Sequence, residues 1–454
     1  MPILQQKQKA PKPARTIVLS FLLVILAGTL LLTLPISSKS GSFTNPLDAF
    51  FTATSATCVT GLIVYDTFTH WNIFGQLVIL LMIQIGGLGL VTFTSFFNFL
   101  IGKKLGLRSM QVASESVSTQ GFSDVKQLIK NVVKFSLAFE GAGALLLMIP
   151  FVSEQGAKGI YTAIFLSVSA FCNAGFDILG YHSQFSSLTP YADNLLVLLP
   201  ICLLITAGGL GFIVWSDLLQ YRKTKHLVLQ TKIVLIVSAV LIVLGTLMVL
   251  ICEGSNPSTM ASMSFGQKLI RSFFQSVTLR TAGFNTIGIA DMTPVTKMFA
   301  LLFMFIGAAP NSTGGGIKVT TLAVVLMTVV SVMRNEPDTL IMGRRVEKFT
   351  VYKALVLIVI STAAVAITSL MLFYLNTASG VTGIDAVFEA VSAFSTVGIS
   401  SGVTEVANAP SRLLIACIMF MGRIGPVSLA LSLSLDRDKK SKSQVIPEGK
   451  VLVG

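Results

Sequence analysis

The chain has 454 residues, of which 53% are hydrophobic and only 12% are charged. Soluble proteins carry about 25% charged residues, so this composition excludes an ordinary soluble domain and indicates a protein of the lipid bilayer. The net charge of +13 does not indicate nucleic acid, because 22 of the 33 Lys and Arg residues lie in five segments between apolar runs, at 1–15, 102–126, 216–232, 334–353 and 436–454. This is the positive-inside pattern of a multi-pass protein of the cell membrane with both termini cytoplasmic.

The first apolar run begins at Thr16, after four basic residues. It is long enough to cross a bilayer, which takes about 20 helical residues, and no small-residue cleavage site follows it, so we interpret it as an uncleaved first span. The five cysteines are scattered and form no zinc or disulfide pattern. The three histidines lie far apart, and no glycine-rich nucleotide motif is present, so the sequence predicts no enzyme and no cofactor in this chain.

A phenylalanine followed ten residues later by a glycine recurs four times along the chain. The pairs are Phe51 and Gly61, Phe165 and Gly175, Phe273 and Gly283, and Phe388 and Gly398. Each pair lies in an apolar stretch too short to span a bilayer, between two longer apolar runs, as expected of a re-entrant loop. The sequence therefore predicts an all-α membrane protein of four tandem helix–pore loop–helix repeats, with eight transmembrane helices around one central pore of pseudo-fourfold symmetry.

The expected repeats cover residues 16–115, 116–225, 226–340 and 341–435, between a cytoplasmic N-terminal segment 1–15 and a cytoplasmic tail 436–454. Their long apolar runs are 16–35, 71–101, 127–152, 193–215, 233–252, 294–333, 354–375 and 410–435. The dozen residues before each glycine are expected to form a short helix whose negative end points into the membrane, where it attracts cations. Asp48 and Asp385 open two of these helices at positions that suit an N-cap or the first turn, and we interpret them as caps with no further role.

Glycine at the same place in all four loops indicates a cation filter built from backbone carbonyls. An ion that leaves water needs its hydration shell replaced oxygen by oxygen, and glycine lets the backbone turn so that successive carbonyls point at one axis. Non-helical backbone at membrane depth is tolerated where it lines a water-filled cavity. The triplet Thr396-Val397-Gly398 also repeats the first half of the T-V-G-Y-G signature of potassium filters.

At these motifs the sequence resembles the Ktr/Trk/HKT superfamily of potassium transporters, most closely the Ktr-type membrane subunit. The resemblance covers essentially the whole chain and is carried by SATCVTGL, SAFCNAGF, RTAGFN and SAFSTVG at the four loops, and by IGGLG, AGGLG, GGGIK, MGRIGP and EGKVLVG elsewhere. It implies that K+ is bound by carbonyls at and just before each glycine. The expected K+-binding residues are Val59, Thr60, Gly61, Asn173, Ala174, Gly175, Thr281, Ala282, Gly283, Thr396, Val397 and Gly398.

By having glycine in all four loops, the sequence resembles the members of the family that select potassium. Some plant relatives have serine in the first loop and favour sodium. Cys58 and Cys172 differ from the commonest pattern of the family. Because the filter chemistry uses backbone oxygens, we expect these two side chains to leave it intact.

A second set of small residues follows the four filter glycines, at Gly86-Gly87, Gly208-Gly209, Gly307-Ala308 and Gly422-Arg423. The fourth places an arginine in a cation pathway. Either Arg423 pairs with a carbonyl or carboxylate and fixes its helix, or it is an electrostatic barrier to permeation. We favour the barrier, because ionisable residues inside the membrane are usually functional.

The run 294–333 is too long for one span, because 40 helical residues would measure about 60 Å, twice the thickness of the hydrocarbon core. Proline and clustered glycines predict a break after Gly307, and the resemblance to Ktr subunits implies a mobile intramembrane gate there (307–316) rather than an inert kink. Lys318 either anchors this loop or snorkels. The expected gate residues are Gly307, Ala308, Ala309, Pro310, Asn311, Ser312, Thr313, Gly314, Gly315, Gly316, Lys318 and Arg423.

Three further ionisable residues lie within apolar segments. Glu140 and Glu389 either bind a coupling ion or act as buried hydrogen-bonding struts, and we favour struts because no chain of membrane carboxylates is present. Arg280, inside the third loop, is expected to brace the filter from behind through its five donors, since facing the ion would oppose conduction.

Together these features predict the ion-translocating membrane subunit of a potassium uptake system, with Na+ as an activator or coupling ion left open. The alternative is a Na+- or H+-coupled secondary transporter with alternating access, although four repeats in one orientation favour a continuous pore. The resemblance implies a homodimer that docks on a cytosolic nucleotide-binding regulatory ring of the RCK type. Basic loops at Arg222 and Arg344 either meet that ring or bind anionic membrane lipid.

Overall fold

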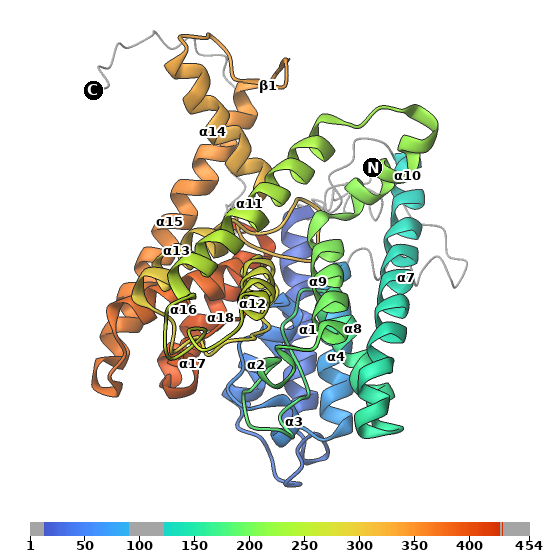
Figure 1. Ribbon diagram of the computed structural model, residues 1–454, viewed down its shortest axis with the longest axis vertical. Coiled ribbons are helices and arrows are strands. Elements are labelled where there is room, and N and C mark those ends of the chain that lie inside the picture. Colours follow the sequence, from blue (N-terminus) through green and yellow to red (C-terminus); the bar gives the residue numbers. More distant parts are fainter. Residues whose placement is uncertain (1–12, 90–121, 427–428, 430–454) are drawn as a thin grey trace, which may run out of the picture.

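The computed structural model of the protein describes residues 13–89, 122–426 and 429, and it is predominantly helical (Figure 1). Most of the predicted N-terminal segment, the end of the predicted run 71–101 with most of the basic loop after it, and the tail 436–454 lie outside the described residues.

Within the described residues, four helices are long and apolar enough to cross a membrane: α1 (Pro13–Thr33), α7 (Phe122–Gln155), α11 (Leu229–Glu253) and α15 (Lys348–Asn376). Most of their side chains face away from the protein; Leu30 is 72% exposed and Ile251 is 76% exposed. Large apolar side chains pointing outward along a whole helix are stable in lipid and unfavourable in water, so these helices form the membrane-facing layer.

A short, buried helix packs against each long one: α2 (Pro46–Cys58), α8 (Lys158–Phe171), α12 (Phe265–Thr278) and α16 (Gly383–Ser395). At 13 or 14 residues, each is about 20 Å long and too short to span. Side-chain caps fix where three of them begin: Asn45, Ser264 in a capping box, and Thr382.

A second helix follows each short one: α4 (Ile73–Leu88), α9 (Leu195–Leu210), α13 (Pro294–Phe305) and α18 (Ala409–Ile424). Each packs on the long helix of its own repeat and on the short helix of the next: α4 on α8, α9 on α12, α13 on α16, and α18 on α2. Because the last second helix packs on the first short helix, the pattern closes on itself.

Two predicted spans are interrupted. The run 193–215 bends by 92° at Gly211, between α9 and α10 (Phe212–Thr224); φ at Gly211 is +89° and an added Cβ would meet the carbonyl of Pro310 at 2.6 Å, so only glycine fits there. The run 294–333 is non-helical between α13 and α14 (Val319–Met333). With the bent pair counted as one span, up to five segments have the length and apolarity to cross a membrane among the described residues, so the number eight stays a prediction.

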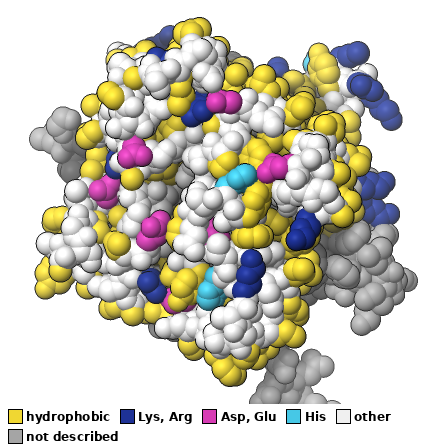
Figure 2. All heavy atoms as spheres, turned by 60° about the horizontal axis from the view of Figure 1, so that its bottom comes forward, with side chains coloured by type: hydrophobic (Ala, Val, Ile, Leu, Met, Phe, Trp, Pro, Cys, Tyr) yellow, Lys and Arg dark blue, Asp and Glu magenta, His cyan; other side chains and the backbone are white. Residues whose placement is uncertain are grey.

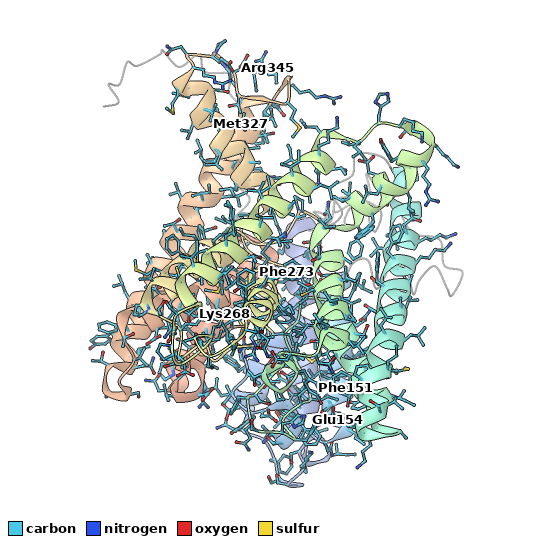
Figure 3. The ribbon with its side chains drawn as sticks, viewed as in Figure 1. Phe151, Glu154, Lys268, Phe273, Met327 and Arg345 are labelled. Carbon is cyan, nitrogen blue, oxygen red and sulfur yellow. The ribbon has the colours of Figure 1, made fainter. Side chains whose placement is uncertain are left out.

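The remaining elements are short. They are η1 (Pro35–Ser37), α3 (Thr67–His70), η2 (Thr189–Tyr191), η3 (Thr377–Ser379), α17 (Val403–Val406) and the strands β1 (Leu340–Ile341) and β2 (Arg344–Arg345). The strands pair antiparallel, Leu340 with Arg345, and at two residues each they leave the described part of the chain predominantly helical, as predicted. Arg345 lies at the end of the molecule opposite Glu154, which marks the lower end of α7 (Figure 3).

Candidate functional site

The chain takes the same unusual backbone path after each short helix. Val59, Asn173, Thr281 and Thr396 are left-handed, with φ between 54° and 69°, and the glycine two residues later also has positive φ. Left-handed backbone costs about 1–2 kcal/mol for residues with a Cβ. In repeats 1, 2 and 4 it is held by a hydrogen bond of 2.8 Å from the next amide to a serine carbonyl of the short helix, as from Thr60 to Ser55.

The four glycines lie next to one another. A Cβ added to Gly61 would lie 2.6 Å from the carbonyl oxygen of Ala174, one added to Gly175 would lie 2.8 Å from Cα of Gly283, and one added to Gly283 would lie 2.8 Å from the oxygen of Val397. A Cβ on Gly398 would clash with the carbonyl of Thr60. The loops of the four repeats therefore meet in cyclic order, with no room for a side chain on any of the glycines.

The third loop differs by one residue from the others, and the predicted alignment there was wrong. Phe51, Phe165 and Phe388 are fully buried, whereas Phe273 is 36% exposed and its neighbour Phe274 is 1% exposed. The amide of Ala282 bonds the carbonyl of Thr278, four residues back, where the other loops reach five residues back. Phe274 is thus the counterpart of the other three, and the third repeat has one residue fewer before its glycine.

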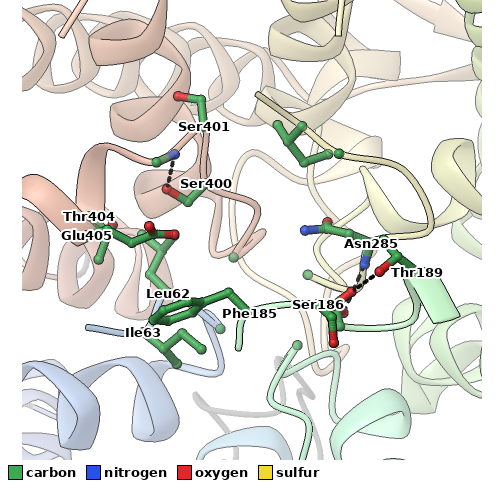
Figure 4. Close-up of a pocket in the computed structure, with 18 of the residues that line it drawn as sticks. Leu62, Ile63, Phe185, Ser186, Thr189, Asn285, Ser400, Ser401, Thr404 and Glu405 are labelled. Atoms are coloured by element: carbon green, nitrogen blue, oxygen red, sulfur yellow. Dashed lines mark hydrogen bonds between the residues drawn. The ribbon is translucent and has the colours of Figure 1, made fainter. Parts of the chain in front are cut away.

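All four glycines line one cavity of about 420 Å³ (Figure 4). Its walls come from the segments that follow each loop, including Leu62, Phe185, Asn285 and Ser400. Figure 2 shows this end of the molecule, where acidic side chains lie among polar and apolar ones.

Three carboxylates line this cavity, those of Asp66, Asp177 and Glu405, and within the described part of the chain no Lys or Arg does. Burial raises the pKa of Asp177 to about 6, and it also raises the pKa of Glu405. A recess lined by one sign of charge concentrates ions of the other. Sequence reasoning missed these residues, although each follows its filter glycine within seven positions.

Below the loops, the second helices approach the short helices closely at the predicted small residues. A Cβ on Gly86, Gly208 or Gly422 would clash with the carbonyl of Thr57, Phe171 or Phe394, each of which lies four residues before its filter glycine. In the third repeat, a Cβ on the corresponding Gly307 would instead clash with the carbonyl of Gly315. The glycines let these helices reach the base of the filter loops.

The interrupted segment between α13 and α14 lies directly under those loops. Thr313 Oγ1 donates to the carbonyl of Phe171 at 3.1 Å, and the amide of Gly315 donates to Thr396 Oγ1 at 2.9 Å. The amide of Ala309 donates to the carbonyl of Gly209 at 3.0 Å. The segment that contains the predicted gate residues therefore touches repeats 2 and 4 as well as its own.

Two positively charged side chains hold this segment in place. Lys318 Nζ donates to the carbonyl of Gly314 at 2.7 Å, which is the contact expected if Lys318 anchors the loop. Arg423 donates to the carbonyls of Thr313 and Gly86, and to that of Gly87 at 3.4 Å. Its guanidinium thus joins the loop to α4. The sequence left two roles open for Arg423, pairing with a carbonyl or carboxylate and an electrostatic barrier, and these contacts are the pairing with carbonyls.

Two further buried ionisable groups belong to the fourth and third repeats. Glu389 accepts from Ser400 at 2.9 Å and from Thr404, bracing the segment after the fourth glycine, as expected of a strut. Arg280 donates to Ser238 of α11 at 3.0 Å, and its Nε has no partner. Arg280 therefore reaches the outer helix, but with fewer bonds than predicted.

Asp48 and Asp385 lie in the first turns of their helices, one of the two positions expected from sequence, but they are not caps and they have a further role. The caps are Asn45 and Thr382. Asp48 pairs with Arg412 of α18 at 2.6 Å, and Asp385 pairs with Lys297 of α13 at 3.0 Å. Each pair joins a short helix to the second helix of the preceding repeat, so both carboxylates fasten neighbouring repeats.

Replacing Asp385 by asparagine is expected to lower the stability of the detergent-solubilised protein by about 1–3 kcal/mol, because it leaves the mostly buried Lys297 ammonium without its ionic partner. Asp193 is the matched control: it pairs with Arg271 at another seam, but its side chain is 52% exposed, and exposed pairs contribute about 0–1 kcal/mol. Thermal unfolding of Asp385→Asn and Asp193→Asn measures both. Equal effects would contradict a specific role of the buried pair.

Apolar outer helices, four short buried helices and an acidic cavity over a ring of backbone turns are the features of a multi-pass membrane protein. The family model of TrkH, a cation transport protein, matches residues 4–443, and the chain belongs to this family. It is therefore a transport protein and not an enzyme, as the sequence predicted, and the resemblance to the Ktr/Trk group is confirmed.

Among its relatives, the chain is 38% identical to Ktr system potassium uptake protein B of Bacillus subtilis, covering 99% of each chain. It is 36% identical to potassium/sodium uptake protein NtpJ of Enterococcus hirae, covering 98% of each. The crystal structure of the potassium transporter TrkH from Vibrio parahaemolyticus is similar, with a TM-score of 0.70, 17% identity and coverage of 95% of this chain and 86% of that one. This likeness supports the fold.

Proposed function

We propose that the chain is the ion-translocating membrane subunit of a potassium uptake system, in which K+ passes through the ring of the four loops. The observation that carries the proposal is the meeting of four equivalent turns, each a left-handed residue followed by a glycine, at the floor of one acidic cavity. The names of full-length relatives, which refer to potassium uptake, support K+ as the ion.

In this proposal the carbonyls of the twelve predicted filter residues replace the water around K+, and the cavity with Asp66, Asp177 and Glu405 is its outer entrance. The short helices point their carbonyl ends at the ring and stabilise the ion there. Eight spans with both termini cytoplasmic place the hairpin of Arg344 and Arg345 on the inside.

The loop 307–316, fastened by Lys318 and Arg423, is the proposed gate. It lies under three of the filter loops or their helices, so its present position obstructs the way from the ring to the interior. A cytosolic regulatory subunit of the RCK type, bound to a homodimer of this chain, would move it. The naming of relatives as protein B or D of a Ktr system is in keeping with further subunits.

The direct test is ion uptake by potassium-transport-deficient cells that make this protein. We expect uptake of K+ in preference to Na+, saturable in K+. Uptake of Na+ alone, or no cation uptake by a purified variant that lacks the loop residues 308–315, in liposomes under a K+ gradient, would refute the proposal. Whether Na+ stimulates K+ uptake is read from the same cells with and without Na+.

Lowering the external pH from about 7.5 to about 5 is expected to raise the K+ concentration for half-maximal uptake about two- to fivefold. The pKa of Asp177 is about 6 because of burial, so its carboxylate is charged above that pH and neutral below it. Protonation removes an attractive charge from the cavity. The Asp177→Asn variant should need the higher K+ concentration for half-maximal uptake already at neutral pH, and this concentration should depend little on pH. K+ uptake measured over this pH range tests the prediction, and a variant with the pH profile of the unaltered protein would contradict this role of Asp177.

A further inference from the structure

Glu140 is a carboxylate buried near the middle of the membrane-spanning part of α7. Its side chain is 6% exposed, and within the described residues no Lys, Arg or His forms an ion pair with it. Burying a carboxylate in this way is costly, so such a residue is retained where its interactions serve a purpose.

The side chain of Glu140 is held between two other helices. Gln84 Nε2 of α4 donates to both carboxylate oxygens, at 3.0 and 3.2 Å. The amide is thereby oriented with its oxygen toward Cys172, whose Sγ lies 3.7 Å from Gln84 Oε1 and 4.0 Å from Glu140 Oε1. The backbone of Glu140 is tied to the same region, because Ser167 Oγ of α8 donates to its carbonyl at 2.6 Å.

Cys172 ends the short helix α8 and directly precedes Asn173, the left-handed residue of the second loop. A Cβ on Gly87 of α4 would lie 2.6 Å from Cys172 Sγ, so α4 presses on the same side chain. Any displacement of Cys172 moves the peptide that begins the turn. The network therefore connects Glu140 to the second filter loop through one side chain.

The equivalent position is not the same residue in all four repeats. Three residues before the filter glycine stand Cys58, Cys172, Arg280 and Ser395. Arg280 is bonded to the outer helix of its repeat through Ser238, as Cys172 is linked to its own outer helix through Glu140. In contrast, Ser395 Oγ has no partner. The second and third loops thus have polar braces to the outer layer that the fourth lacks.

We propose that Glu140 is a positioning residue for ion selection, which acts through Gln84 and Cys172 to fix the carbonyls of the second loop. The inference rests on the proposed filter function and deepens it. It assigns Glu140 no direct contact with the ion.

The test measures uptake of K+, Rb+ and Na+ by unaltered protein and by Glu140→Ala, Glu140→Gln and Cys172→Ala. Glu140→Ala is expected to change the K+ to Na+ ratio by about threefold or more. Glu140→Gln should change it less, because an amide still accepts a hydrogen bond from Gln84. If Glu140 acts through Cys172, the double variant Glu140→Ala/Cys172→Ala should show no larger change than Cys172→Ala alone.

Glu253→Gln is the matched control. Glu253 is also buried, but its partners are Asn256, Thr259, Thr293 and Thr296 around the far end of α11. Its replacement should lower thermal stability and leave the ratio unchanged, which separates positioning from general destabilisation. Should Glu140→Ala fail to fold, Glu140→Gln and Cys172→Ala carry the test.

The inference is overturned if folded Glu140 and Cys172 variants keep the ion ratios of the unaltered protein, or if the two substitutions change the ratio additively. The proposed function fails in a different way, namely if the unaltered protein itself does not prefer K+. The two failures are therefore distinguished by the first measurement of the series.

Discussion

Gly283→Ser is expected to lower the preference for K+ over Na+ at least about tenfold, equivalent to roughly 1.4 kcal/mol. Gly283 has φ of +88°, and an added Cβ would lie 2.8 Å from both Cα of Gly175 and the oxygen of Val397. Since both neighbours are backbone of the adjacent loops, no side-chain rotation relieves the clash. The ring must open, and the carbonyls then no longer match a dehydrated K+ ion. Uptake of the two ions by cells measures the ratio.

Gly402→Ser provides the matched control. Gly402 lines the same cavity and has φ of +100°, but an added Cβ meets nothing within 4 Å. Both substitutions place a side chain on left-handed backbone, and they differ in whether neighbouring loops are pushed apart. If Gly283→Ser keeps the ion preference of the unaltered protein, the ion does not pass through the ring of the four glycines.

The arrangement of the loops was accessible from sequence because it depends on backbone. A short helix, a left-handed turn and a glycine recur with nearly constant spacing, and glycine is required wherever two backbones touch. The same reasoning located the break after Gly307, where helix-breaking residues cluster. The one-residue difference in the third loop was hidden, because Phe273 and Phe274 are adjacent and either satisfies the pattern.

The side-chain partners could not be predicted in the same way. Asp48 pairs with Arg412, 364 residues further along the chain, and Asp385 pairs with Lys297. Such pairs depend on which repeats become neighbours, and this follows from the closure of the ring. Carboxylates in first helical turns have an adequate local explanation in the helix dipole, so the long-range one was overlooked. The acidic cavity was missed for the same reason, because its three carboxylates come from three different repeats.

Replacing Arg423, which holds the predicted gate in place, is expected to raise K+ flux strongly. Arg423 forms charge-assisted hydrogen bonds to the loop at Thr313 and to α4 at Gly86, each worth about 1.5–3 kcal/mol. Arg423→Ala should therefore free the loop, remove a positive charge from the cation path, and raise flux about tenfold in liposomes without a regulatory subunit. Arg412→Ala on the same helix α18, which contacts Asp48 and not the loop, should lower stability without raising flux.

Arg423→Lys separates the two roles of the arginine. Lysine keeps the positive charge but cannot reproduce the fork of donors that reaches both carbonyls. If Arg423 is mainly an electrostatic barrier, the lysine variant keeps the low flux; if it is mainly a latch on the loop, its flux rises toward that of Arg423→Ala. The contacts with Thr313, Gly86 and Gly87 favour the second outcome.

Deletion of residues 308–315 tests the loop itself. The residues that flank it lie close together, since a Cβ added to Gly307 would lie 3.0 Å from Cα of Gly316, so the shortened chain can close with little movement of α13 or α14. The deletion should raise flux at least as much as Arg423→Ala, and the two changes combined should add little, because both remove the same obstruction. Unchanged flux in the deletion variant would show that the loop does not obstruct the pathway, whatever Arg423 does.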